Sequence, residues 1–82
     1  MPTFTTTDLA VAAAIKHTLN LLPEVRPTGR LCEFVFSLDD PTQAQRVAQQ
    51  FYAGTLTVRA KRFFEDWRDL RTLAADAKGV QR

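Results

Sequence analysis

The stretch Leu31-Cys32-Glu33-Phe34-Val35-Phe36-Ser37-Leu38 decides the fold of this chain. Its even-numbered positions are all apolar, whereas its odd-numbered positions mix apolar and polar side chains. Successive side chains of a β-strand point to opposite faces, so this alternation predicts a strand over residues 31–38. The face that carries Cys32, Phe34, Phe36 and Leu38 is therefore expected to lie against the core.

The residues before this strand indicate a partner strand and a hairpin. Pro23 and Pro27 exclude a helix and are tolerated only in an edge strand. The segment Arg26-Pro27-Thr28-Gly29-Arg30 has Pro at the second and Gly at the fourth position of a type I turn, so it is expected to form that turn. A hairpin alone is marginal in water, and the short extended run around Phe4 is a candidate third strand.

Two segments of the chain have the apolar spacing of shorter helices. The first helix is expected over about residues 7–20, capped by Thr5 or Thr6, with Asp8 favouring its positive end. The second is expected over about residues 41–53. Acidic residues and Pro41 suit its start, and Gly54 suits its end because glycine adopts the left-handed conformation freely.

The third and longest helix is expected over about residues 58–77, with Thr57 as its cap and Gly79 after its end. The sequence thus predicts a small α+β fold in the order (β)-α-β-β-α-α, a hairpin packed against three helices. Residues 1–82 are expected to form a single domain, because 82 residues and 9.3 kDa leave no room for a second core. Residues 1–3 and 79–82 are expected to fray.

Composition and charge exclude several classes of protein. Hydrophobic residues are 45% and charged residues 24%, unlike a disordered chain. The net charge of +2 conceals an asymmetry: residues 1–40 hold three basic and five acidic residues, and residues 41–82 hold eight basic and four acidic ones. An anionic partner is therefore expected at the C-terminal half.

Location in the cell is predicted from the cysteine count and from the apolar runs. Cys32 is the only cysteine, so an internal disulfide is impossible and a reducing compartment is the simplest setting. The N-terminus lacks a basic segment before a long apolar run, and the stretch Leu9–Ile15 is far shorter than the roughly 20 residues of a membrane span. We expect a cytoplasmic protein with no membrane contact.

The residues that could carry catalysis are few. A nucleophile would be Cys32 or Ser37, and the only histidine is His17. Cys32 is in phase with the core side of its strand, where a thiol is inert. No metal-ligand spacing and no phosphate-binding loop is present, and the acidic pair before Pro41 suits a helix start. The sequence therefore predicts a non-enzymatic protein with no cofactor, no metal and no small-molecule substrate.

The basic residues of the last helix support two interpretations. Arginine suits phosphate, and aromatic side chains lie between the basic ones, so nucleic-acid contact is predicted at Arg59, Arg62, Arg68 and Arg71. The alternative is a solvated face on which neighbouring charges neutralise one another, through the pairs Lys61–Glu65, Arg62–Asp66 and Glu65–Arg68.

Association is the second candidate property. A core this small leaves apolar surface to be completed by a second copy or by another protein. The candidate interface residues are Tyr52, Phe63, Phe64 and Trp67. We expect a homodimer or a protein partner, and the sequence does not distinguish the two.

Five stretches of the chain resemble a family of similarly short, uncharacterised proteins found in bacteria, phages and other mobile elements. These stretches are Phe4-Thr5-Thr6-Thr7-Asp8-Leu9-Ala10, Glu33-Phe34-Val35-Phe36, Phe51-Tyr52-Ala53-Gly54-Thr55-Leu56-Thr57-Val58, Arg62-Phe63-Phe64 and Leu70-Arg71. The chain departs from the family at Thr57-Val58-Arg59, where an acidic cap is usual. The resemblance implies a mobile-element setting and no activity. The expected function is accordingly that of a small binding or adaptor protein, or alternatively of a nucleic-acid-binding accessory.

Overall fold

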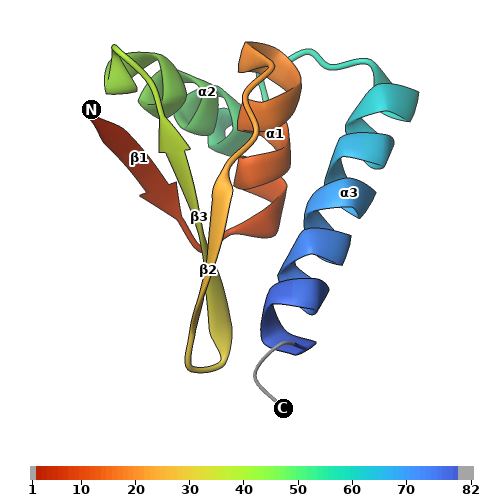
Figure 1. Cartoon of the computed structure of the whole chain (residues 1–82). Helices are drawn as coiled ribbons and strands as arrows, with labels where there is room; N and C mark the ends of the chain where they lie inside the picture. Colours follow the sequence, from red (N-terminus) through yellow and green to blue (C-terminus); the bar gives the residue numbers. More distant parts are fainter. Residues whose placement is uncertain (1, 80–82) are drawn as a thin grey trace.

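The computed structural model describes residues 2–79 and contains a three-stranded sheet and three helices (Figure 1). The elements follow in the order β1 (Thr3–Thr6), α1 (Leu9–Leu19), β2 (Glu24–Thr28), β3 (Leu31–Ser37), α2 (Pro41–Ala53) and α3 (Ala60–Gly79). The predicted α+β class, the order of elements and the third strand are therefore confirmed. The expectation of fraying at residue 1 and residues 80–82 lies outside the described part of the chain, whereas Gly79, expected to fray after the end of the last helix, is instead the last residue of α3.

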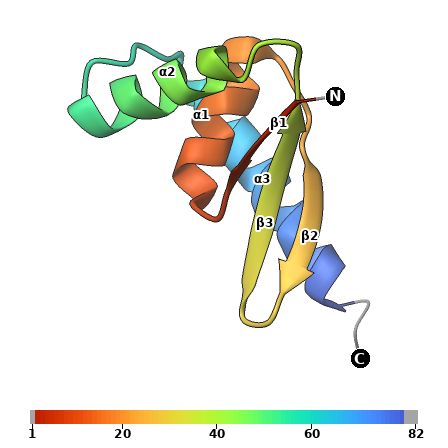
Figure 2. The ribbon, with the colours of Figure 1, turned by 90° about the vertical axis from the view of Figure 1, so that its left-hand side faces the viewer.

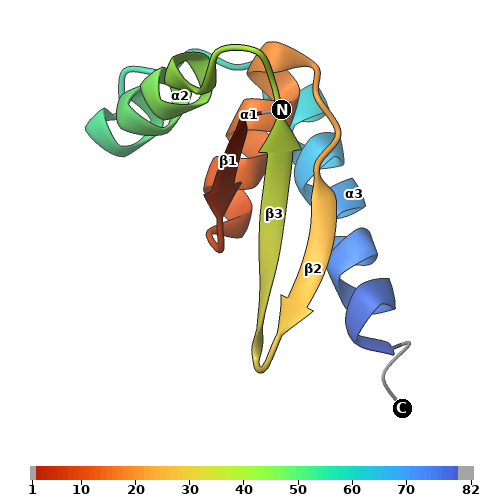
Figure 3. The same cartoon turned by 60° about the vertical axis from the view of Figure 1, so that its left-hand side comes forward.

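The sheet has the order β1-β3-β2, and both pairings are antiparallel. Figure 3 shows β3 between the other two strands, with α1 and α3 behind them. Phe4 lies opposite Phe36 and Val25 lies opposite Phe34, so these four side chains share one face of the sheet. Thr3, expected to fray, is instead opposite Ser37.

The core forms between that face and the helices. Phe34 is 2% exposed and Phe36 is 0% exposed, as the alternation predicts. Residues 11–15 of α1 are all buried, and three of them are alanines whose small side chains let neighbouring elements approach closely. Val35 is also buried although it points to the other face, because β3 is the central strand and Val35 lies between Thr5 and Glu24.

The start of α1 differs from the prediction. Asp8 is the N-cap, and its Oδ1 accepts hydrogen bonds from the backbone N–H of Ala10 at 2.9 Å and of Val11 at 3.3 Å. Thr5 and Thr6 cannot cap this helix because they belong to β1, where they pair with β3. The helix begins at Leu9, two residues later than expected, and Asn20 follows it in the left-handed conformation.

The hairpin turn also lies two residues beyond the predicted position. Pro27 and Thr28 are the last residues of β2, and Thr28 lies opposite Leu31, so the loop consists of Gly29 and Arg30. Two-residue hairpin loops favour a residue of positive φ at their first position, and Gly29 has a φ of 62°. Glycine therefore fixes this turn, and the type I turn predicted at Pro27 is wrong.

The bounds of α2 agree with the prediction, whereas those of α3 do not. Asp40 caps α2 by accepting from the N–H of Thr42, and Gly54 ends it at a φ of 74°. Figure 2 shows α2 beyond the end of the sheet where β3 finishes. α3 begins at Ala60, and Thr57 makes no hydrogen bond within residues 2–79. No helix in that range is long and apolar enough to cross a membrane.

Candidate functional site

α3 has an inner face that attaches it to the rest of the protein. Leu70 is 0% exposed, and Phe63 and Ala74 pack partly buried against the same core. These residues recur at helical spacing, so they form one continuous stripe. The inner face contacts α1 and β2, and α3 therefore lies beside α1 on the core side of the sheet (Figure 1).

A polar cluster joins the start of α3 to the end of α1. Lys16 Nζ donates to Asp66 Oδ1 at 2.6 Å, and His17 Nδ1 lies 3.0 Å from Asp66 Oδ2. His17 Nε2 accepts the backbone N–H of Arg59 at 3.3 Å, so the imidazole proton lies on Nδ1 and is donated to Asp66. The ring of His17 also meets that of Phe63 edge to face. We call Lys16, His17 and Asp66 the clasp.

The clasp overturns a predicted ion pair. Sequence spacing predicts a pair between Arg62 and Asp66, but the carboxylate of Asp66 instead contacts Lys16 and His17 of α1. The other two predicted pairs, Lys61–Glu65 and Glu65–Arg68, are also wrong, because neither forms among the residues the structure describes. Sequence did carry a signal for the clasp: Asp66 is three residues after Phe63 and four before Leu70, which places a carboxylate on the inner face.

The clasp changes the acidity of Asp66. Partial burial opposes the ionised form of this carboxyl, and hydrogen bonds and charge from Lys16 and His17 favour it. The second effect is larger, so the pKa of Asp66 is held below its ordinary value. Asp66 is therefore a carboxylate at neutral pH and an anchor between α1 and α3.

The adjoining side of α3 carries an exposed stripe, which we call the outer stripe. Phe64 is 60% exposed and Trp67 is 41% exposed, and together with Arg68 and Arg71 they line a surface hollow of about 180 Å³. Ala60 and Ala75 continue the same side of the helix toward its ends, and both are exposed. The outer stripe thus consists of Ala60, Phe64, Trp67, Arg68, Arg71 and Ala75.

The four predicted nucleic-acid residues do not share a surface. Arg68 and Arg71 belong to the outer stripe. At about 100° per residue, Arg62 lies on the opposite side of α3 from Arg71. Arg59 precedes the helix, and its carbonyl accepts the N–H of Phe63 while its own N–H is bound to His17. Two arginines remain together, in place of the four expected.

The four predicted interface residues are divided as well. Phe64 and Trp67 lie in the outer stripe, and Phe63, one residue away, packs on the core. Tyr52 is exposed on α2, where its hydroxyl donates to Asp8 Oδ2 at 3.0 Å, a bond that raises the pKa of the tyrosine. Tyr52 therefore ties the end of α2 to the cap of α1.

The residues considered for catalysis lie apart. Cys32 is buried and its Sγ lies 3.7 Å from the carbonyl oxygen of Ala74, whereas His17 contacts Asp66. Eight residues of helix separate Ala74 from Asp66, or about 12 Å at 1.5 Å per residue. The structure does not bring Cys32 and His17 together. Within residues 2–79 no group of three or more His, Cys, Asp or Glu side chains could hold a metal ion.

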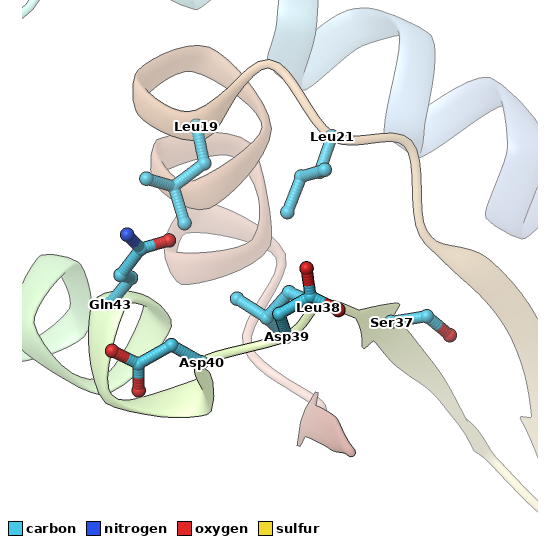
Figure 4. Close-up of a pocket in the computed structure, with 7 residues that line it drawn as sticks. All are labelled: Leu19, Leu21, Ser37, Leu38, Asp39, Asp40 and Gln43. Atoms are coloured by element: carbon cyan, nitrogen blue, oxygen red, sulfur yellow. The ribbon is translucent and has the colours of Figure 1, made fainter. Parts of the chain in front are cut away.

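A second hollow, of about 410 Å³, lies where α1 ends, β3 ends and α2 begins. Figure 4 shows Leu19 and Leu21 reaching toward Leu38, with two carboxylates at the start of α2. One of them, Asp40, is already used as the α2 cap. This hollow was not predicted from the sequence, because its residues come from three separate elements.

Comparison with known proteins found no match among family models, curated proteins or solved structures. The resemblance stated above therefore stays a prediction, and the functional argument rests on the surface of this chain.

Proposed function

We propose that this chain is a non-enzymatic binding protein, an adaptor that docks another protein on the outer stripe of α3. The observation that carries the proposal is the joint exposure of Phe64 and Trp67 beside Arg68 and Arg71. Trp and Arg are the residues most enriched among those that dominate binding energy at protein interfaces, and such residues cluster around pockets. The hollow between them supplies a place for one side chain of a partner.

The inner face and the outer stripe of α3 have different roles. The inner face already holds the helix through Leu70 and the clasp, so the aromatic residues of the outer stripe are not needed to attach it. Exposed aromatic surface that the fold does not use favours a role in binding. A non-enzymatic role is favoured by the clasp, which occupies both ring nitrogens of His17. The mobile-element setting is proposed on the family resemblance alone.

A photo-crosslinking experiment tests the docking surface. Benzoyl-phenylalanine is placed at Phe64, or at Gln49 on the exposed side of α2 as the matched control, in cells that express the chain. We expect position 64 to give a discrete protein adduct and position 49 to give none, because only the outer stripe is covered by a partner. Equal adducts from both positions, or no protein adduct from position 64, would contradict the proposal.

Nucleic-acid binding is a second candidate, favoured by one observation. Arg68 and Arg71 make no ion pair among residues 2–79, and they flank exposed aromatic side chains, as in proteins that bind single strands. A gel shift with single- and double-stranded DNA and RNA is the test. Phosphate contact would give a shift that weakens steeply between low and moderate salt and is lost in the double variant Arg68→Ala/Arg71→Ala. We expect no shift even at low salt.

A further inference from the structure

Arg71 lines two neighbouring hollows. One is the hollow of about 180 Å³ in the outer stripe, which we call the stripe hollow. The other, of about 150 Å³, is formed where α3 passes the hairpin and the start of α1, and we call it the hairpin hollow. Its lining includes the apolar side chains of Leu9, Leu31 and Ala74, together with Arg30 and Arg71. The two hollows therefore form one surface that extends from α3 onto the hairpin.

The charged side chains that line this surface are all arginines. Arg68 and Arg71 line the stripe hollow, Arg30 and Arg71 line the hairpin hollow, and among residues 2–79 no acidic side chain lines either one. At about 100° per residue, every carboxylate of α3 lies about 110° or more round the helix from the centre of the stripe hollow. These carboxylates are Glu65, Asp66, Asp69 and Asp76. The surface is therefore complementary to a negatively charged occupant.

We propose that the partner docks through an acidic segment with two large apolar side chains, one for each hollow. The inference rests on the proposed function, since it gives the chemistry of the partner that covers the outer stripe. Carboxylates of the segment pair with Arg68 and Arg71, which make no ion pair among residues 2–79. The planar guanidinium of arginine binds a carboxylate through two parallel hydrogen bonds, so these pairs also orient the segment.

The spacing of the hollows allows one short segment to fill both. On α3 the stripe hollow takes its lining from residues 64–71, and the hairpin hollow from residues 71–74. Their centres are thus about five residues apart on the helix, or about 7 Å along its axis. Two side chains on the same face of an extended chain are also about 7 Å apart. A single segment therefore supplies both apolar side chains, with acidic residues beside them.

The lining of the surface favours a protein segment over a nucleic acid. The hairpin hollow is lined by aliphatic side chains, which suit an apolar side chain of a partner, whereas nucleic-acid bases stack on aromatic rings. Nucleic-acid binding also depends on many phosphate contacts, and three arginines on a chain of net charge +2 supply few. An acidic peptide uses the arginines and both hollows together.

Selection from short random peptides displayed on phage tests the chemistry of the occupant. The full chain is the target, and the double variant Arg68→Ala/Arg71→Ala is used first to remove peptides that bind elsewhere on the protein. We expect the enriched peptides to be acidic and to carry two large apolar residues each. Enriched peptides that are neutral or basic, or no enrichment over the double variant, would overturn the inference.

Charge reversal tests the contact with the arginines. The most enriched peptide is labelled with a fluorophore, and its anisotropy is measured as the chain is added. Arg71→Glu is expected to weaken binding about tenfold or more, because it replaces an attraction at both hollows by repulsion. Arg62→Glu is the matched control: it changes the net charge equally on the opposite side of α3, so its effect should stay within about twofold. Circular dichroism verifies that both variants are folded.

Two results of the anisotropy experiment would overturn the inference. Equal losses in Arg71→Glu and Arg62→Glu would show that the overall charge of the chain attracts the peptide and that the two hollows do not hold it. Tighter binding of a labelled oligothymidine than of the selected peptide would show that the arginines serve a nucleic acid.

Crosslinking at the hairpin hollow separates this inference from the proposed function. Benzoyl-phenylalanine at Leu31, an exposed residue of the hairpin hollow, is compared with the same group at Phe64 in cells that express the chain. We expect both positions to give an adduct of the same mass, because one segment covers both hollows. An adduct at position 64 with none, or one of another mass, at position 31 would overturn this inference and leave docking on the outer stripe standing. No adduct at position 64 would overturn both.

Discussion

Replacement of Phe36 by alanine is expected to reduce the free energy of unfolding by about 3 to 5 kcal/mol. Phe36 is 0% exposed and lies on the central strand, opposite Phe4 of β1 and under the helices. Its truncation removes a large apolar side chain and leaves a cavity that the packed alanines of α1 are too small to fill. Both effects destabilise the folded state, and neither has a compensating gain.

The loss expected from Phe36→Ala is large relative to the total free energy of unfolding. At about 0.05 to 0.15 kcal/mol per residue, a domain of this length has a stability of only about 4 to 12 kcal/mol. Phe36→Ala is thus expected to remove at least a quarter of the total stability, and most of it if the total lies at the lower end of that range. Urea unfolding followed by circular dichroism measures it, at a protein concentration low enough for a monomer. Phe64→Ala is the matched control, because the same truncation at an exposed site should stay within about 0.5 kcal/mol. Equal losses in the two variants would place the core elsewhere.

The sheet and helices could be predicted because their signals are periodic. Alternation over residues 31–38 determined which side of β3 is buried, and the buried face agrees. The errors are at the ends of elements, where several residues compete for one role. Thr5, Thr6 and Asp8 can all cap a helix, and only the pairing of β1 with β3 excludes the two threonines. That pairing is long-range, so no local pattern reports it.

The residues of the candidate site could be predicted from the sequence, but the direction in which each side chain points could not. Helical spacing identified Phe63, Phe64 and Trp67 as apolar positions, yet the sequence did not separate the residue that packs inward from the two that lie outside. The deciding fact is that Leu70 and Ala74 face the core, which places Phe63 inside and Phe64 about 100° away. Helical geometry likewise decides on which surface each arginine lies. Four of them were grouped by sequence proximity, and the helix divides them between surfaces.

Asp66→Ala is expected to lower the free energy of unfolding by about 1.5 to 3 kcal/mol at pH 7, the range for hydrogen bonds to a charged group. The substitution removes the carboxylate that holds Lys16 and His17, which are themselves mostly shielded from water. The end of α1 and the start of α3 then lose their polar connection, although Leu70 still anchors α3. Asp69→Ala is the matched control, since Asp69 is an exposed carboxylate on the same helix with no ion pair among the described residues.

The difference between wild type and Asp66→Ala is also expected to depend on pH. The pKa of Asp66 is lower in the folded than in the unfolded chain, so the unfolded chain binds the proton more readily. The stabilisation is therefore present above the unfolded pKa of about 3.9, and it is lost as the pH falls through the folded value. Urea unfolding from pH 7 downward measures it: the wild-type advantage should hold to about pH 5 and disappear in stronger acid, because a neutral Asp66 no longer attracts Lys16. An advantage that persisted unchanged at pH 2 would show that the contribution of Asp66 is packing and not charge.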